Sequence, residues 1–320
     1  MNSYFFVAVF IFCCFILSWL SSQLVTSLVL VAKYLRWREF IIAFFVMAMA
    51  ASLPNFFIDL SAALRGMPEL AFGDIVGGNL VDLTLVLAVA VFFSKNGLSA
   101  ESEMVQKSAM FTAVIALLPL LLVVDGRLGR FDGIILITAF ILYSFWIFSK
   151  KEHFKKVYRH HGQNIIYGFK SFLVNLVKIG GLTALLLVVS HVIINSAQFF
   201  SDTFGISLAL VGILIVGLGN CFPELYFSVI SARNDQNWLV LGDIMGSVII
   251  VATLVLGVIA LISPFKINDF SPFFTAMVFL VISAVVSLYF IWSGKKIIKK
   301  EGLFLLFIYI IFILVEIFIQ

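Results

Sequence analysis

Two carboxyl groups, those of Asp82 and Glu224, stand inside long apolar runs of the sequence. Ionisable groups at membrane depth are costly and by default mark the path of an ion or a substrate. Pro223 directly precedes Glu224, and a proline within a helix removes one backbone donor and frees a carbonyl. In lipid the freed carbonyl must face protein, water or an ion. We therefore expect this spot to suit a hard cation, which binds carboxylate and carbonyl oxygens.

Neutral oxygens near the two carboxyl groups complete the candidate site. A dehydrated divalent cation needs about two negative charges, because an uncompensated ion in hydrocarbon costs on the order of tens of kcal/mol. Amide and hydroxyl oxygens are available at Ser52, Asn55, Asn79, Asn220 and Ser247. Each of these five, taken alone, fits a hydrogen bond between helices as well as it fits a ligand. Cys221 is a soft ligand that suits Ca²⁺ poorly, so we expect it to serve packing.

The surroundings of these residues occur twice in the chain, 169 positions apart and without a gap. The first copy reads ASLPNFFIDLSAALRGMPELAFGDIVG from residue 51, and the second reads NCFPELYFSVISARNDQNWLVLGDIMG from residue 220. Pro54 aligns with Pro223, and Asp74 aligns with Asp243. Two related halves with interrupted hydrophobic segments at matching places are typical of secondary transporters with a site near the membrane midplane.

Asp74 and Asp243 permit two interpretations. Asp74, Gly78 and Asp82 are spaced four apart and share one helix face, so Asp74 can line the same pathway as Asp82. Asp74 also lies nearer the expected start of its helix, where a carboxylate can cap the N-terminus. Capping and pathway lining stay equally open for both aspartates.

Composition predicts an all-α polytopic membrane protein. Of the 320 residues 62% are hydrophobic and 12% are charged, and the mean hydropathy is +1.16. A soluble domain has a charged fraction of about 25%. Runs near the roughly 20 residues that span a bilayer fall at about 4–32, 39–64, 70–93, 108–124, 131–149, 171–199, 205–232, 238–263, 272–293 and 302–319. We expect ten transmembrane helices in two five-helix repeats, 1–149 and 171–320, joined by a basic linker at 150–170.

The positive charges predict the orientation. The loops after the first, third, fifth, seventh and ninth runs carry most of the basic residues, and the opposite loops carry Arg65, Arg127, Arg130 and Lys266. Both termini are then outside, and the 150–170 linker is cytoplasmic, where its charges attract anionic lipid headgroups. Because each half has an odd number of spans, the two repeats are inverted. The net charge of +4 is dispersed over short loops and gives no indication of nucleic-acid binding.

Enzyme and cofactor motifs are missing from the sequence. It contains no HExxH and no GxSxG, and the three cysteines form no CxxC pair. We therefore expect a protein without enzymatic activity and without a cofactor, whose partners are inorganic cations and membrane lipids. The compact sequence without a regulatory domain suggests the cytoplasmic membrane of a prokaryote and function as a monomer.

The two windows resemble the alpha-repeats of the cation/calcium exchanger superfamily, which contains the sodium/calcium exchangers. There each repeat reads roughly G-T-S-x-P-E-L, followed by G-[ND]-x-x-G-S-N-x-x-[ND]. Here the matching stretches are 51–55 and 73–82 in the first copy, and 219–225 and 242–247 in the second. The resemblance implies an inverted-repeat antiporter whose ions bind between the four alpha-repeat helices, here at about 41–93 and 210–263.

The chain departs from the family pattern at several ligand positions. Asn55 replaces the first-repeat glutamate, and Val248 and Val251 replace the last polar positions of the second repeat. One carboxylate per repeat is kept, Asp82 and Glu224, in different motif positions. Sites for several sodium ions are thereby in doubt, whereas a calcium-sized divalent site with two charges stays compatible with the sequence.

The leading hypothesis is an alternating-access antiporter that moves Ca²⁺ against Na⁺ or protons. Asp82 and Glu224 hold the ion in this hypothesis, and Asn55 and Asn79 complete its shell. One alternative is an exchanger of another cation, such as a monovalent cation/proton exchanger. The other is a transport-inactive relative with a structural or binding role.

Overall fold

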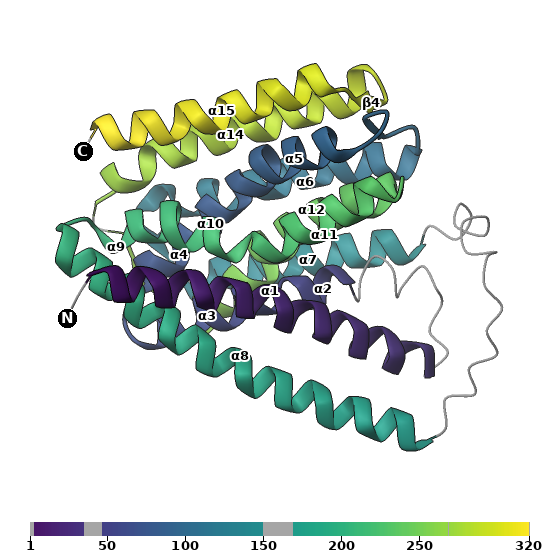
Figure 1. Ribbon diagram of the computed structural model, residues 1–320. Coiled ribbons are helices and arrows are strands. Elements are labelled where there is room, and N and C mark those ends of the chain that lie inside the picture. The colour runs from purple at the N-terminus through teal and green to yellow at the C-terminus, as the bar shows by residue number, and fades with distance from the viewer. Residues whose placement is uncertain (1–2, 35–46, 150–168, 268, 320) are drawn as a thin grey trace.

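The computed structural model describes residues 3–34, 47–149, 169–267 and 269–319, and helices dominate it (Figure 1). The first half contains α1 (Ser3–Tyr34), α2 (Met47–Ala51), α3 (Leu53–Leu64), α4 (Pro68–Val81), the π-helix η2 (Asp82–Val86), α5 (Leu87–Phe93), β1 (Leu98–Ser99), α6 (Glu103–Leu122), the 3-10 helix η3 (Val123–Asp125), β2 (Arg127–Leu128) and α7 (Arg130–Ser149). The second half contains α8 (Phe169–Phe204), α9 (Leu208–Leu210), the π-helix η4 (Val211–Val216), α10 (Gly217–Asn220), α11 (Phe222–Arg233), α12 (Asn237–Ile249), the π-helix η5 (Ile250–Val255), α13 (Leu256–Ile262), β3 (Phe265–Lys266), α14 (Ser271–Ser293), β4 (Lys296–Ile297) and α15 (Lys299–Ile319).

Nine helical segments within the described residues are long and apolar enough to cross a membrane. They agree with nine of the ten predicted spans. The remaining predicted span, 39–64, contains the shorter apolar helix Leu53–Leu64, and part of it lies outside the described residues. The 150–170 linker also falls almost entirely outside them. The protein is thus an integral, multi-pass membrane protein with helices as its spanning elements.

Contacts between the helix ends show that the two halves are inverted. Lys95, just past α5, forms an ion pair with Asp235, just past α11, at 2.9 Å. At the other end, Ser263 Oγ, just past α13, donates to the carbonyl of Ala63 near the end of α3 (3.3 Å). α3 and the α4–α5 segment form a hairpin, so α3 ends at the face opposite to the one where α5 ends. Helix α11 ends at the same face as α5. Helices α3 and α11 therefore run in opposite directions.

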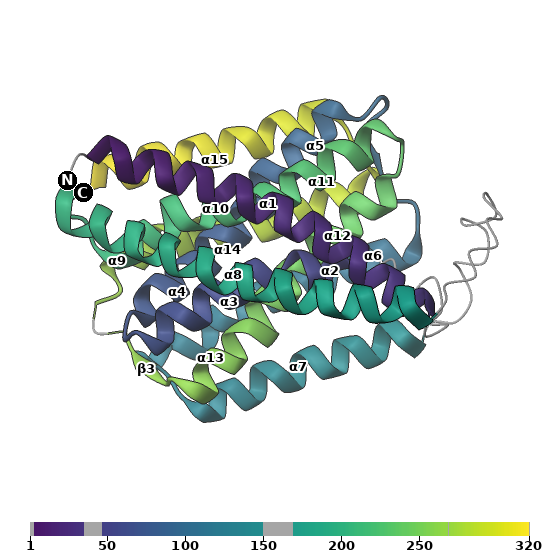
Figure 2. The same ribbon diagram turned by 60° about the horizontal axis from the view of Figure 1, so that its bottom comes forward.

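Two short antiparallel strand pairs join the halves at opposite ends of the bundle. β1 pairs with β4, with Leu98 opposite Ile297, and β2 pairs with β3, with Arg127 opposite Lys266. Figure 1 shows β4 at the right end of the bundle, whereas Figure 2 shows β3 at the left end, where α1 begins and α15 ends. Each ladder therefore links one half to the other at one membrane face.

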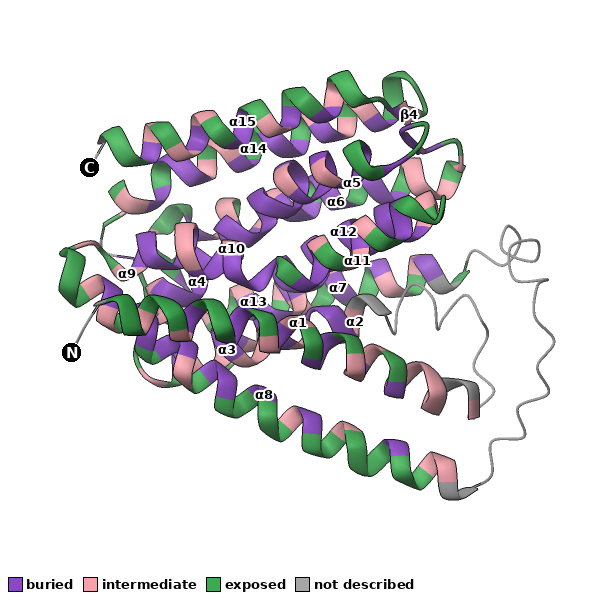
Figure 3. Cartoon of the chain, in the orientation of Figure 1, coloured by how far each residue is buried: buried purple, intermediate pink, exposed green. Residues whose placement is uncertain are grey.

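Burial separates central from peripheral helices (Figure 3). In Pro68–Phe93 and in Asn237–Ile262, 83% of the most apolar window is buried, against 17% in Ser171–Phe204. The α4–α5 and α12–α13 segments thus form the centre. Helices such as α8 and α15 expose apolar side chains, as expected of a surface that faces lipid.

The central helices are interrupted at equivalent positions of the two repeats. A turn at Ser52 separates α2 from α3, and a turn at Cys221 separates α10 from α11, each two residues before a proline. These prolines cannot donate to the preceding turn, which explains the breaks. The predicted span 205–232 is confirmed as the membrane-long segment Leu208–Arg233, which a turn at Cys221 divides. The sequence predicted a loosened backbone there, and the structure confirms it.

The two π-helical stretches η2 and η5 also lie 169 positions apart. Thr84 Oγ1 in η2 donates to the carbonyl of Leu80, and Thr253 Oγ1 in η5 donates to the carbonyl of Ile249, both at 2.5 Å. In a π-helix the backbone bonds are displaced by one residue, so a side-chain donor satisfies a carbonyl of the preceding turn. The repeat therefore extends to the irregular backbone around the site.

Glycines allow α4 to approach η4 and α10 at backbone distance. A Cβ atom built on Gly77 would lie 2.2 Å from the carbonyl oxygen of Ile213, and one on Gly212 would lie 2.4 Å from that of Leu70. Neither contact can be relieved by a side-chain rotation, because both partners are backbone atoms. Small residues in membrane helices serve such close packing. This contact brings Asp74 and Asp82, on α4 and η2, beside the break in the second repeat.

Candidate functional site

A central cluster forms where the end of α4, the start of α11 and the middle of α12 meet. Asp82 begins η2, Glu224 lies in the first turn of α11, and Ser247 lies in α12. Ser247 Oγ donates to Glu224 Oε1 at 3.2 Å, and it also lies within hydrogen-bonding reach of the Asp82 carboxyl group. All three residues are at most 2% exposed. The structure thus brings together two predicted carboxyl groups and one predicted hydroxyl group.

The charges of this cluster are not balanced by neighbouring donors. Within the described chain, Asp82 Oδ1 and Glu224 Oε2 receive no hydrogen bond. Glu224 is close enough to Asp82 and to Asp243 for the negative charges to repel one another. The N-terminus of α11 places a partial positive charge near Glu224, which offsets a small part of this repulsion. A bound cation would offset far more of it.

Cys221 lies between α4 and the central cluster. Its thiol Sγ donates to the carbonyl of Gly78 at 3.4 Å and lies within hydrogen-bonding reach of the Asp82 carboxyl group. The thiol packs against α4, as predicted, and its hydrogen bonds are an addition to that prediction. Cys221 therefore forms part of the wall of the central cluster.

A second acidic cluster lies between α3, α4 and α10. The carboxyl groups of Asp59 and Asp74 lie within hydrogen-bonding reach of each other, and Asn220 Nδ2 donates to Asp74 Oδ2. Asn220 was predicted to supply a neutral oxygen to the central site, with a hydrogen bond between helices as the alternative. The structure shows the hydrogen bond between helices. Asp59 was missed, although it is an acid in an apolar run one helical turn after Asn55. Asp82 was selected as a carboxyl group inside an apolar run, and Asp59 meets the same criterion.

Helix capping does not explain Asp74 or Asp243. Helix α4 begins at Pro68 and α12 begins at Asn237, so both aspartates lie about two turns inside their helices. They are 2% and 6% exposed. The capping interpretation is therefore wrong for both, and pathway lining stays a prediction.

The other predicted site residues are buried close to the breaks. Ser52 stands at the turn between α2 and α3, and Asn55 lies in the first turn of α3, at the position equivalent to Glu224 in α11. Asn79 lies in the last turn of α4, three residues before Asp82. Asn55 Oδ1 accepts no hydrogen bond from any residue that the structure describes. A role for these three residues as cation ligands stays a prediction.

The buried charges share one sign. Six carboxyl residues are buried in the described ranges: Asp59, Asp74, Asp82, Glu224, Asp243 and Glu316. Among those same residues no lysine or arginine is buried, and all three ion pairs found there are exposed. Also within them, no three His, Cys, Asp or Glu side chains gather as a metal centre. Compensation of the buried charge must therefore come from protons or from cations held by two carboxylates and neutral oxygens.

A cavity of about 270 Å³ lies between α1, α2, α11 and α12. Its polar lining consists of Ser18, Ser21, Ser22, Thr26, Tyr226 and Asp243. The cavity also touches Ala51 and Pro223, the neighbours in sequence of Ser52 and Glu224, and follows α11 to Ile230. It therefore extends from beside the central cluster toward the membrane face that holds the Lys95–Asp235 ion pair.

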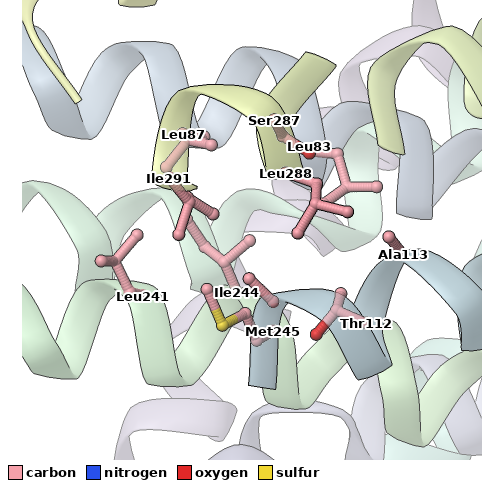
Figure 4. A pocket seen from close by; sticks show the side chains of 11 residues that line it. Leu83, Leu87, Thr112, Ala113, Leu241, Ile244, Met245, Ser287, Leu288 and Ile291 are labelled. Atoms are coloured by element: carbon pink, nitrogen blue, oxygen red, sulfur yellow. The ribbon is translucent and has the colours of Figure 1, made fainter. Parts of the chain in front are cut away.

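A second pocket, shown in Figure 4, does not suit an ion. It holds about 10 Å³ and is lined mostly by Leu, Ile, Ala and Met side chains of η2, α5, α6, α12 and α14. Its hydroxyl groups on Thr112 and Ser287 donate to carbonyls of their own helices. This pocket is a packing defect whose lining does not include Glu224.

A family model described as sodium/calcium exchanger protein matches the chain twice, at residues 5–149 and 174–318. These two ranges are again 169 positions apart. Among curated proteins, the sodium/calcium exchanger MaX1 of Methanosarcina acetivorans is 25% identical over 331 aligned positions, which cover 92% of this chain and 93% of that protein. The inner membrane protein YrbG of Escherichia coli is 24% identical over 258 positions, covering 78% and 77%.

Solved structures with the same fold include those of the sodium-calcium exchanger NCX_Mj. The structure soaked with 100 mM Na⁺ and 10 mM Sr²⁺ superposes with a TM-score of 0.68 at 22% identity, over 98% of both chains. The structure soaked with zero Na⁺ and Ca²⁺ gives a TM-score of 0.65, also at 22% identity, over 97% of this chain and 98% of that one. At this identity the likeness shows a shared architecture.

Proposed function

The chain belongs to the sodium/calcium exchanger protein family, and on this basis we propose that it is a secondary active antiporter that exchanges Ca²⁺ for Na⁺ or protons. The observation that carries the proposal is the central cluster. Asp82 and Glu224 are buried, lie close together, and have oxygens that no donor in the described chain satisfies. Two such carboxylates offer the charge that a divalent cation needs in a medium of low dielectric constant.

In the proposed site Asp82 and Glu224 hold the cation, and Ser247 orients Glu224. Ser52, Asn55 and Asn79 supply neutral oxygens from the first repeat, since they flank the break and the end of α4. Ca²⁺ takes six to eight oxygens in a flexible geometry, which suits a mixed set of carboxylate, amide and hydroxyl groups. Val251, which occupies in η5 the position of Asp82 in η2, offers no oxygen and makes the site asymmetric.

Alternating access is supported by the cavity beside the cluster. Because it borders Pro223 and Asp243 and extends toward one membrane face, an ion can approach Glu224 from that face. The inverted repeat provides a second arrangement in which the equivalent surfaces open to the opposite face. Empty carboxylates repel each other, so reorientation without a cation is unfavourable, and transport in one direction requires a counter-ion in the other.

The compartment follows from the charge of the loops. Basic residues gather at the face that holds Lys95 and Arg233, which we assign to the cytoplasm. Both termini then lie outside, because the chain begins and ends at the other face (Figures 1 and 2). The cavity accordingly opens toward the cytoplasm, in the cytoplasmic membrane of a prokaryote.

Uptake of radiolabelled Ca²⁺ into proteoliposomes tests the function. Vesicles are preloaded with Na⁺, or given an outward proton gradient, and compared with vesicles without a gradient. We expect accumulation under one of the two gradients, and that gradient identifies the counter-ion. No accumulation under either would contradict Ca²⁺ exchange and would favour another cation or a transport-inactive relative, as the loss of a carboxylate at Asn55 permits.

A further inference from the structure

Asp59 and Asp74 form a carboxylate pair that the central site does not use. Asp59 lies on α3 and Asp74 on α4, and they are 0% and 2% exposed. Their carboxyl groups lie within hydrogen-bonding reach of each other. Across the described chain neither Asp59 oxygen receives a hydrogen bond, and Asp74 Oδ1 likewise has none. Three buried carboxylate oxygens of one pair thus lack a donor among the described residues.

The pair is separate from the central cluster. Asp74 and Asp82 are eight residues apart on one continuous helical segment, which corresponds to about 12 Å along its axis. The acidic group that lies against Asp59 is Asp74, whereas Glu224 interacts with Asp82 and Asp243. One cation between Asp82 and Glu224 therefore cannot contact Asp59 and Asp74 as well.

The repeat shows that the pair is not a requirement of the fold. In the second repeat, Ser228 occupies the position of Asp59, and Asp243 occupies that of Asp74. Asn220, which donates to Asp74, is replaced at the equivalent position by Ala51, which lines the cavity beside Asp243. One half thus packs the same backbone with one carboxylate fewer. The cost of burying an additional acid in the other half must be offset, either by a proton shared with Asp74 or by a bound cation.

We propose that Asp59, Asp74 and Asn220 form a second site for a hard cation, Na⁺ or Ca²⁺, distinct from the Asp82–Glu224 site. The three unsatisfied carboxylate oxygens bind the ion, and the Asn220 amide fixes Asp74 by its hydrogen bond. Hard cations prefer such oxygens. This inference rests on the proposed cation exchange and deepens it, because a carrier with two sites binds more than one cation per cycle.

Cation-dependent thermal stability of the purified protein in detergent tests the second site. Ligands that bind the native state raise its melting temperature by mass action. The protein is titrated with NaCl and separately with CaCl₂, each against choline chloride of equal ionic strength. In Asp59→Asn we expect the concentration of Na⁺ or Ca²⁺ that gives half of the stabilisation to rise roughly tenfold or more, the scale of losing a metal-site group. Ser228→Ala, the matched variant in the other repeat, should titrate like the wild type.

The variant Glu224→Gln separates the second site from the central one. It should retain part of the cation-dependent stabilisation, and adding Asp59→Asn should abolish the remainder. If Asp59→Asn and Asp74→Asn both titrate like the wild type with both salts, the second site does not exist. A loss of all cation response in Glu224→Gln alone would also overturn it. If instead Glu224→Gln leaves the Ca²⁺-dependent stabilisation intact, the proposal of a central Ca²⁺ site is wrong. The titration of Asp59→Asn still shows in that case whether the Asp59–Asp74 site exists.

Discussion

At the residue scale, the contact between Ser247 and Glu224 predicts a partial loss of Ca²⁺ affinity when the hydroxyl group is removed. The hydroxyl donates to the carboxylate in a buried place, and such a bond contributes about 1 kcal/mol. Ser247→Ala should therefore weaken Ca²⁺ binding roughly fivefold without abolishing transport. The apparent affinity is read from uptake at increasing external Ca²⁺. An affinity equal to that of the wild type would remove Ser247 from the site.

Single residues were predicted to different degrees. Asp82 and Glu224 could be recognised because a carboxyl group in an apolar run is expensive wherever the helix packs. Asp59 meets the same criterion and could have been found. The hydrogen bond from Asn220 to Asp74 and the thiol of Cys221 beside Asp82 could not, because both depend on how α10 faces α4 across the break.

At the element scale, the close approach of α4 to η4 predicts that alanine substitution at two glycines changes the thermal stability very differently. In Gly77→Ala the added Cβ would meet the Ile213 carbonyl oxygen at 2.2 Å, so the helices must separate. Overpacking of this kind costs about 1–3 kcal/mol. Gly180 on α8 has no neighbour within 4 Å, so Gly180→Ala is the matched control. Thermal unfolding in detergent should show a lower midpoint for the first variant and an unchanged or higher one for the second.

The helices themselves were largely predictable, and their irregularities only in part. Long apolar runs determine where spans lie, and eight predicted spans agree with unbroken helical segments to within several residues. Pro54 and Pro223 indicated loosened backbone near the two breaks. The π-helical turns η2 and η5 have no comparable signal, because Thr84 and Thr253 stabilise them only once the helix has been distorted by packing.

At the scale of the whole molecule, the cavity predicts which membrane face reaches the site. Ser21 lines the cavity, and Asp202 lies exposed near the opposite end of the bundle, at the end of α8. In a background in which the three native cysteines are replaced, Ser21→Cys should react with a membrane-impermeant thiol reagent only from the cytoplasmic face. Asp202→Cys should react only from outside. Labelling of Ser21→Cys from outside alone would reverse the proposed orientation or the proposed open side.

The architecture was the part that the sequence predicted best. An offset of 169 within the two central windows, together with ten apolar runs, predicted two five-helix units, and an odd number of spans makes them inverted. The family model extends the same offset to residues 5–149 and 174–318. The structure confirms this through the contacts of Lys95 with Asp235 and of Ser263 with Ala63. Which helices touch across the two halves depends on side-chain packing that no single window of sequence contains.

The central claim is that Asp82 and Glu224 together hold the transported Ca²⁺. The most direct test is the binding of radiolabelled Ca²⁺ to purified Asp82→Asn and Glu224→Gln, with Glu316→Gln as the control. Glu316 is a buried carboxylate on α15, outside the site, so its variant removes an equivalent charge elsewhere. We predict that the two site variants stay folded and lose the Ca²⁺ held between Asp82 and Glu224, so that each binds at least one Ca²⁺ fewer per protein than the wild type, while Glu316→Gln binds like the wild type. Normal binding in both site variants would contradict the account.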